Sequence, residues 1–174
     1  MTQPLEMAEL LERGLDTMKR YYIAYGSNLN IRQMKWRCPT AKAVGTAILE
    51  NHTLYFRGSK TGSYLTIEPK IGGKVPVAIW SVTEADERAL DRYEGYLTFY
   101  FKESFRLDVV PLNGDEMVTL DCFAYIMRDG RPIGLPTRSY LNTCLEGYHD
   151  FGFDKRILKR TVERMERILW KRMD

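Results

Sequence analysis

The sequence predicts an α+β fold in which a curled, mainly antiparallel or mixed β-sheet forms a partial barrel with flanking helices. Strand-like segments are concentrated in the middle of the chain and are separated by short turns, whereas amphipathic helical segments stand at both ends. The chain has 174 residues and a hydrophobic fraction of 44%. Because this length is usual for one domain, the predicted elements are expected to share a single core.

The first element is expected at residues 5–18, where leucines and a methionine recur at helical spacing. Residues 1–20 would form an N-terminal helical extension that packs on the main domain or on a second subunit. The main domain is expected to span residues 21–153. It opens with a short buried strand in "YYIAYGS", and helical spacing follows in "NLNIRQMKWRCP" until Pro39 stops the helix.

Four strands are expected next, because apolar runs alternate with the turn-forming segments "GSKTGS" and "KIGGK". These strands cover residues 43–49, 52–56, 64–68 and 75–82. Thr83 and Asp86 then form a capping-box pattern, which predicts a helix that ends near Tyr93.

Two longer strands are expected at residues 99–110 and 117–127, joined through the hairpin signal "PLNGDE". After the loop "RDGRPIGLPTRS", two helices close the chain. The last of them, residues 154–174, is amphipathic and is expected to pack on the same domain.

The last helix carries eight Lys/Arg against four Asp/Glu, and because its apolar residues recur at helical spacing, the charges are expected to form the opposite face. This arrangement is typical of a solvated helix face, and a phosphate-binding patch is the alternative. The formal net charge of the chain is only +3, and Glu163 and Glu166 interrupt the basic run. We therefore expect no nucleic-acid partner, while the flanking helices allow a homodimer.

The cysteines Cys38, Cys122 and Cys144 lie far apart without a CxxC pair, which is typical of reduced thiols in the cytoplasm. The first twenty residues contain no apolar run, so neither secretion nor membrane association is expected. His52 and His149 form no metal-ligand motif with the cysteines, and no phosphate-binding glycine motif is present. We expect no metal and no cofactor, so any chemistry depends on carboxylates, hydroxyls and backbone amides.

Glu94 is the acid with the most unusual position, because it ends a predicted helix immediately before Gly95. The negative end of the helix dipole should raise the pKa of its carboxyl, which suits a general base near neutrality. Most glutamates at such positions are merely solvated. Glu103 is the competing acid: it falls on the apolar face of its predicted strand, where it is either buried and paired or turned outward by a bulge.

Together these stretches form an ordered series: "YGSNL" after the first strand, then "LDRYEG", an aromatic and a basic residue, "LPTRSYL" and "EGYHDFGFD". The series resembles the γ-glutamylcyclotransferase family of the bacterial type, with the fold named for the butirosin-pathway cyclotransferase. The resemblance covers residues 21–154 and leaves the first and last helices as extensions.

The resemblance implies an activity and a set of site residues. Family members release 5-oxoproline from γ-glutamyl amines or γ-glutamyl amino acids when the substrate's α-amine attacks its own γ-carbonyl. Glu94 matches the family's acid, which transfers the protons. The expected substrate-binding residues are Tyr25, Gly26, Ser27, Asn28, Leu29, Tyr100 and Tyr140.

Some alternatives stay open. Asn28 argues against placing the chain with the glutathione-specific relatives, and "AIW" at residues 78–80 replaces the Gly-x-Tyr of many relatives, so the leaving amine is undetermined. Gly-Ser-Asn is otherwise a plain turn with an Asn helix cap, and Tyr100 and Tyr140 are otherwise core residues. The alternative function keeps the pocket without the reaction: the protein is then a non-catalytic module that binds a γ-glutamyl or amino-acid ligand, or a protein partner.

Overall fold

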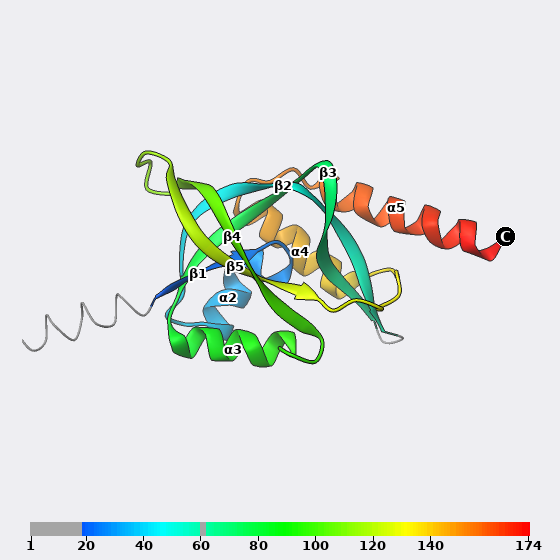
Figure 1. Ribbon diagram of the computed structural model, residues 1–174, viewed down its shortest axis with the longest axis horizontal. Helices are drawn as coiled ribbons and strands as arrows, with labels where there is room; N and C mark the ends of the chain where they lie inside the picture. The colour runs from blue at the N-terminus through cyan, green and yellow to red at the C-terminus, as the bar shows by residue number, and fades with distance from the viewer. Residues whose placement is uncertain (1–18, 60–61) are drawn as a thin grey trace, which may run out of the picture.

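The computed structural model describes residues 19–59 and 62–174. In this part of the chain five strands form a closed barrel in the order β1-β3-β2-β4-β5, with helices around it (Figure 1). The strands are β1 (Arg20–Ala24), β2 (Lys42–Ser59), β3 (Gly62–Val82), β4 (Tyr100–Pro111) and β5 (Val118–Met127). The N-terminal extension expected at residues 1–20 lies almost entirely outside the described residues.

The barrel closes through β1. This strand pairs antiparallel with β3 and parallel with β5, where Tyr21 lies opposite Cys122. The remaining neighbours, β3 with β2, β2 with β4 and β4 with β5, are all antiparallel. The sheet is therefore mixed and mainly antiparallel, which confirms the predicted fold class, and the partial barrel that we expected is closed.

The four strands expected between residues 43 and 82 are two long ones, so the predicted breaks at residues 50–51 and 69–74 are wrong. The ladder between β2 and β3 continues past Glu50 with a register shift at Asn51, which adopts a φ of 59°. Gly72, at a φ of 79°, donates its N–H to Asn51 Oδ1 over 3.0 Å. The predicted break is therefore an irregularity inside one long hairpin. The ladder bonds lost at Asn51 are replaced by this local bond, and the two strands continue beyond it.

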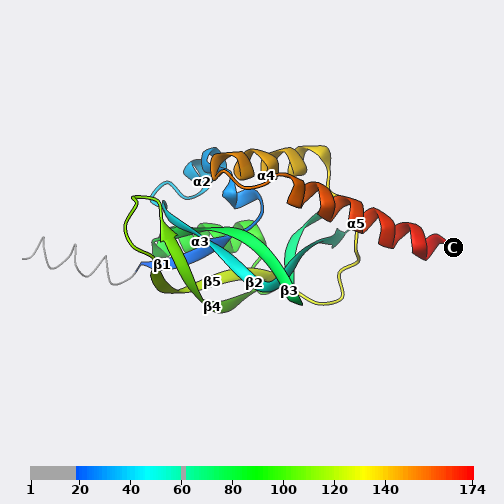
Figure 2. The ribbon, with the colours of Figure 1, turned by 90° about the horizontal axis from the view of Figure 1, so that it is seen from above.

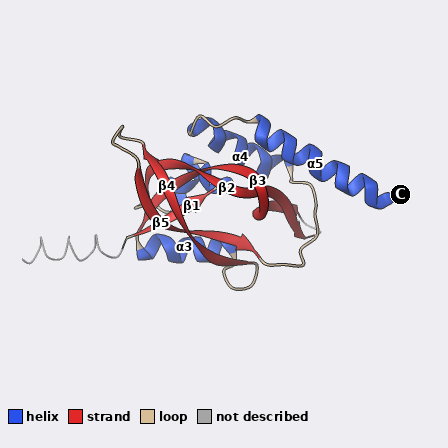
Figure 3. Ribbon diagram, turned by 45° about the horizontal axis from the view of Figure 1, so that its top comes forward, coloured by secondary structure: helices blue, strands red, loops and turns tan. Residues whose placement is uncertain are grey.

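A 3₁₀ helix and four α-helices complete the described chain: η1 (Ser27–Leu29), α2 (Ile31–Arg37), α3 (Glu84–Glu94), α4 (Arg138–Asp150) and α5 (Arg156–Met173). Helix α3 lies along one side of the barrel, whereas α4 and α5 lie on another (Figure 3). The capping box is confirmed: Thr83 Oγ1 accepts from the Asp86 N–H, and Asp86 Oδ2 accepts from the Thr83 N–H. The helix ends at Gly95, which adopts a φ of 61° as the left-handed C-cap.

Helix α5 packs on the barrel through its first half and then leaves it. Leu158, Thr161 and Met165 are buried, and the Arg164 guanidinium hydrogen bonds to the Leu54 carbonyl of β2. The second half projects away from the body (Figure 2), and Trp170 is 70% exposed. Among the described helices, none is long and apolar enough to cross a membrane.

Glu103 is exposed and does not enter the core. The expectation of a buried, paired acid is therefore wrong, and a bulge is not the reason, because β4 and β5 pair without a register shift. The face of β4 that carries Glu103 is buried only further along the strand, at Leu107 and Val109. The strand thus has an apolar face over only part of its length.

Candidate active site

One cavity of about 400 Å³ lies where the C-terminal ends of β1 and α3 meet the first residues of β3 and β4. The polar part of its wall combines the loop after β1 with the end of α3, and aromatic side chains form most of the rest. The lining residues are Tyr22, Tyr25, Gly26, Ser27, Asn28, Tyr64, Leu65, Arg92, Tyr93, Glu94, Gly95, Phe99, Tyr100, Tyr125 and Tyr140.

The cavity brings together the residues expected from the sequence, with one exception. Six of the seven expected substrate-binding residues line it together with Glu94: Tyr25, Gly26, Ser27, Asn28, Tyr100 and Tyr140. Leu29 does not line it. Its side chain is fully buried and faces Gly147 of α4, so Leu29 anchors the loop to the core.

Glu94 is the last residue of α3, and its carboxylate receives a hydrogen bond from the loop. Asn28 Nδ2 lies 3.3 Å from Glu94 Oε1 and 2.9 Å from the Tyr22 hydroxyl. Burial in the cavity wall raises the pKa of Glu94 from 4.5 to about 7, and the nearby Arg37 guanidinium opposes this rise. The direction agrees with the expectation from the sequence, but the principal cause is desolvation.

The loop Gly26–Asn28 contacts α3 a second time through Ser27. Its hydroxyl lies 3.0 Å from the Tyr93 hydroxyl, so two successive loop side chains meet two successive residues of α3. Gly26 has a spatial reason to lack a side chain, since a Cβ there would lie 3.2 Å from the Tyr140 hydroxyl and 3.5 Å from Leu65 Cβ. The alternative, in which Gly-Ser-Asn is a plain turn with an Asn helix cap, is also weakened, because the residue that caps α2 is Asn30 and not Asn28.

Helix α4 supports this loop from behind. A Cβ on Gly147 would lie 2.6 Å from Leu29 Cβ and 2.7 Å from the Asn30 nitrogen, so the helix and the loop backbone approach as closely as a glycine permits. Asn30 Nδ2 also donates to Glu146 Oε2 over 2.9 Å and to the Thr143 carbonyl over 3.2 Å. The loop is therefore held in place by packing and hydrogen bonds on its far side.

Tyr100 and Tyr140 are oriented by one backbone position of β3. The Tyr100 hydroxyl donates to the Leu65 carbonyl over 3.0 Å, and the Tyr140 hydroxyl accepts from the Leu65 N–H over 3.0 Å. Burial raises the pKa of both phenols well above the usual value, so both stay neutral. They are cavity-wall residues with fixed hydroxyl positions.

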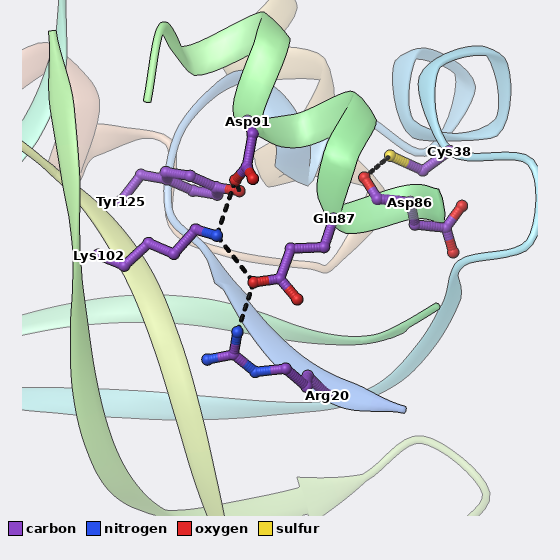
Figure 4. A network of polar contacts seen from close by, with 7 residues as sticks. All are labelled: Arg20, Cys38, Asp86, Glu87, Asp91, Lys102 and Tyr125. Atoms are coloured by element: carbon purple, nitrogen blue, oxygen red, sulfur yellow. Dashed lines mark hydrogen bonds and ion pairs between the residues drawn. The ribbon is translucent and has the colours of Figure 1, made fainter. Parts of the chain in front are cut away.

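Helix α3 is attached to the barrel by a network of charged groups (Figure 4). Lys102 Nζ of β4 lies 2.8 Å from both Glu87 Oε1 and Asp91 Oδ1, and Arg20 of β1 also pairs with Glu87. The Tyr125 hydroxyl of β5 donates to Asp91 Oδ1 over 2.5 Å. Three strands therefore fix the helix whose last residue is Glu94.

Several residues of this site were missed by sequence reasoning. Arg37 hydrogen bonds to Asn28 Oδ1, and Tyr64, Phe99 and Arg92 line the cavity. A signal existed for Tyr22 and Tyr93, which flank the recognised motifs in "YYIAYGS" and "RYEG". For Tyr64 and Phe99 no local signal existed, because only the closed barrel brings them to the loop.

The described residues contain no group of His, Cys, Asp or Glu side chains that could hold a metal ion. The chemistry that the site itself offers is proton transfer by one carboxylate whose pKa lies near neutrality, beside amide and hydroxyl groups that can orient a polar ligand.

An α+β barrel with such a cavity defines a protein of the γ-glutamylcyclotransferase-like fold class. The family model for gamma-glutamyl cyclotransferase, AIG2-like, matches residues 22–142, and the chain belongs to this family.

Solved structures share this fold. A protein named gamma-glutamyl cyclotransferase is 23% identical with a TM-score of 0.68, and the match covers 85% of this chain and 86% of that one. An uncharacterized human protein is 23% identical with a TM-score of 0.67 over 83% and 86% of the two chains. YkqA from Bacillus subtilis is 17% identical with a TM-score of 0.67, over 92% of this chain and 58% of that one. No curated protein matches the sequence significantly.

Proposed function

We propose that the protein is a γ-glutamylcyclotransferase that releases 5-oxoproline from a γ-glutamyl amine or a γ-glutamyl amino acid. The observation that carries the proposal is the shared cavity, in which Asn28 Nδ2 of the loop lies 3.3 Å from Glu94 Oε1. A volume of about 400 Å³ is of the size that small-molecule sites have. Membership of the gamma-glutamyl cyclotransferase family supports the same activity.

The reaction needs little from the protein, because nucleophile and electrophile belong to one molecule and only have to be held in a folded conformation. The Glu94 carboxylate takes a proton from the substrate's α-ammonium group. The freed nitrogen attacks the γ-carbonyl carbon, so that a nitrogen–carbon bond forms and the carbonyl oxygen becomes an oxyanion. When the oxyanion collapses, the bond to the leaving nitrogen breaks, and that nitrogen takes the proton from Glu94. The ring nitrogen then gives its second proton to the Glu94 carboxylate, which passes it to the released amine, so that the products are 5-oxoproline and an ammonium ion and Glu94 is ionised again.

The remaining lining groups hold the substrate in this scheme. The backbone amides of the Gly26–Asn28 loop receive the oxyanion, and loss of one such donor costs about 10²–10³ in rate in other enzymes. Gly26 keeps the loop free of a side chain that would displace Tyr140. Tyr100 and Tyr140 form the wall against which the γ-glutamyl chain folds.

The proposal is tested with a panel of γ-glutamyl amino acids and γ-glutamyl amines labelled with ¹⁵N at the α-amine, in water enriched in ¹⁸O. Cyclotransfer predicts 5-oxoproline that keeps ¹⁵N and contains no ¹⁸O, because the α-amine becomes the ring nitrogen and no water is consumed. Hydrolysis would instead release glutamate with one ¹⁸O.

Glu94→Gln is the first variant for this assay. We expect loss of 5-oxoproline release with a retained fold, because the amide keeps the size of the side chain and can still accept from Asn28. Release that survives in Glu94→Gln contradicts the assignment of Glu94. A ligand that raises the melting temperature of the wild type while no product forms would make the protein a binding module.

A further inference from the structure

Arg37 contacts residues of the site but has no role in the proposed reaction. It is the last residue of α2, and its guanidinium makes three contacts. It hydrogen bonds to Asn28 Oδ1, it donates to Gln33 Oε1 of its own helix over 3.3 Å, and its Cζ lies 3.4 Å from the centre of the Tyr93 ring. Arg37 therefore joins the loop to the end of α3.

The bond to Asn28 determines which way its amide group points. A carboxamide has one accepting and one donating end. Since Arg37 occupies the Asn28 oxygen, the Asn28 nitrogen is turned toward Glu94 Oε1. The reverse orientation would place the amide oxygen against the carboxylate and the amide N–H groups against the guanidinium, and both contacts would be repulsive.

The same guanidinium holds Tyr93. A cation stacked on an aromatic ring is attracted to the face of the ring, and the stacking restricts the ring's position. The Tyr93 hydroxyl lies 3.0 Å from Ser27 Oγ. Arg37 thus supports both contacts between the loop and α3, the one made by Asn28 and the one made by Ser27.

Arg37 also supplies the positive charge that acts on Glu94. The other titratable groups that interact electrostatically with Glu94 are phenols from β1 and the residue that follows it, and from α3, β4 and α4: Tyr22, Tyr25, Tyr93, Tyr100 and Tyr140. Burial raises the pKa of each of them, so they are neutral in the physiological range. Arg92 of α3 lines the cavity as well, whereas Asp91 pairs with Lys102.

We propose that Arg37 is the positioning residue of this site: it fixes the Asn28 amide and the Tyr93 ring so that the Glu94 carboxylate meets the substrate in one orientation. As a step of catalysis this rests on the proposed cyclotransferase activity. The positioning of Asn28 and Glu94 can be measured without turnover.

The test compares Arg37→Gln, Arg37→Lys and the control Lys35→Gln, which removes a positive charge from the exposed face of the same helix. The first readout is NMR titration of protein labelled with ¹³C at the glutamate carboxyl groups, in which Glu94→Gln identifies the Glu94 resonance. We expect Arg37→Gln to move the Glu94 titration to higher pH, because the opposing positive charge is gone, and Lys35→Gln to leave it unchanged.

The second readout is the pH dependence of kcat for 5-oxoproline release. Arg37→Gln should lower kcat about 10- to 100-fold near neutral pH, which is a smaller effect than the loss of a direct oxyanion donor. It should also shift the rising limb of the curve of kcat against pH to higher pH, as the Glu94 titration shifts. Arg37→Lys should return the rising limb toward its wild-type pH, because the positive charge is kept. It should not restore kcat, because an ammonium group cannot reproduce the planar donor fork of Arg37 or its stacking on the Tyr93 ring.

Identical Glu94 titrations in Arg37→Gln and wild type would overturn the proposal, and so would a loss of kcat with no movement of the limb. Should Arg37→Gln not fold, Arg37→Lys decides: wild-type kcat in that variant overturns the positioning role. If the wild type releases no 5-oxoproline while Arg37→Gln still moves the Glu94 titration, the proposed function fails and the positioning of Glu94 by Arg37 stands.

Discussion

Glu94 binds its proton more tightly in the folded protein than a solvated glutamate does, because burial raises its pKa from 4.5 to about 7. The group's contribution to stability is therefore fully present below about pH 4.5 and is lost as the pH rises through 7. Glu94→Gln removes this dependence, since an amide does not titrate in the range. At the residue scale, the raised pKa that suits Glu94 to the proposed proton transfer therefore makes the folded protein less stable at neutral pH.

We predict that the melting temperature of Glu94→Gln minus that of the wild type increases between pH 5 and pH 8. The wild type must bury an ionised carboxylate at the higher pH, whereas the variant does not. Differential scanning calorimetry at four pH values across this range measures the difference. A difference that stays constant with pH would mean that Glu94 titrates like a solvated glutamate.

A second prediction concerns Gly26. In Gly26→Ala the new methyl group would lie 3.2 Å from the Tyr140 hydroxyl, so we expect a loss of about 10²-fold in kcat/KM as Tyr140 is displaced. Because Tyr140→Phe removes the oxygen that the methyl group meets, the losses in Gly26→Ala and Tyr140→Phe should not add in the double variant. Strictly additive losses in kcat/KM would show that this contact is not the cause.

At the scale of the elements, the site depends on how closely α4 approaches η1. An alanine inside a helix is usually more favourable than glycine by about 1 kcal/mol. At position 147 the added methyl group would lie 2.6 Å from Leu29 Cβ and 2.7 Å from backbone atoms of the loop, so either the helix or the loop must move. Overpacking of this kind typically costs about 1–3 kcal/mol.

We therefore predict that Gly147→Ala lowers both the free energy of unfolding and the rate of 5-oxoproline release. Urea denaturation measures the first, and the mass-spectrometric assay measures the second. Gly114→Ala is a suitable control for stability, because no heavy atom lies within 4 Å of its Cβ position, although its φ of 83° makes some strain expected there. Wild-type activity in Gly147→Ala would show that α4 does not position the loop.

The elements show what local sequence signals can predict. The capping box at Thr83, the acid before Gly95 and the hairpin between β4 and β5 depend on a few neighbouring residues, and each was predictable. The long β2–β3 hairpin was not, because the bond from the Gly72 N–H to Asn51 joins residues that lie far apart in the sequence. Turn-forming residues were therefore read as breaks where the ladder in fact continues.

For the whole molecule, closure of the barrel decides which residues meet. The motif residues Gly26, Asn28 and Glu94 could be found from the sequence because they resemble a family pattern. Leu29 was expected to contact the ligand because it matches the last position of the same motif, but the fold turns its side chain into the core. Tyr64 reaches the cavity from β3 and Phe99 from the turn before β4, and no local periodicity in the sequence indicates that they meet there.

The central claim is that one carboxylate transfers the protons inside the cavity of the barrel. The most direct test is the rate of 5-oxoproline release as a function of pH. It is measured for the wild type and for Glu94→Gln with a γ-glutamyl substrate that the wild type turns over. We predict a rate that rises with pH through an apparent pKa of about 7 in the wild type and is lost in Glu94→Gln at every pH. Release by Glu94→Gln at the wild-type rate, with the same pH dependence, would contradict the claim.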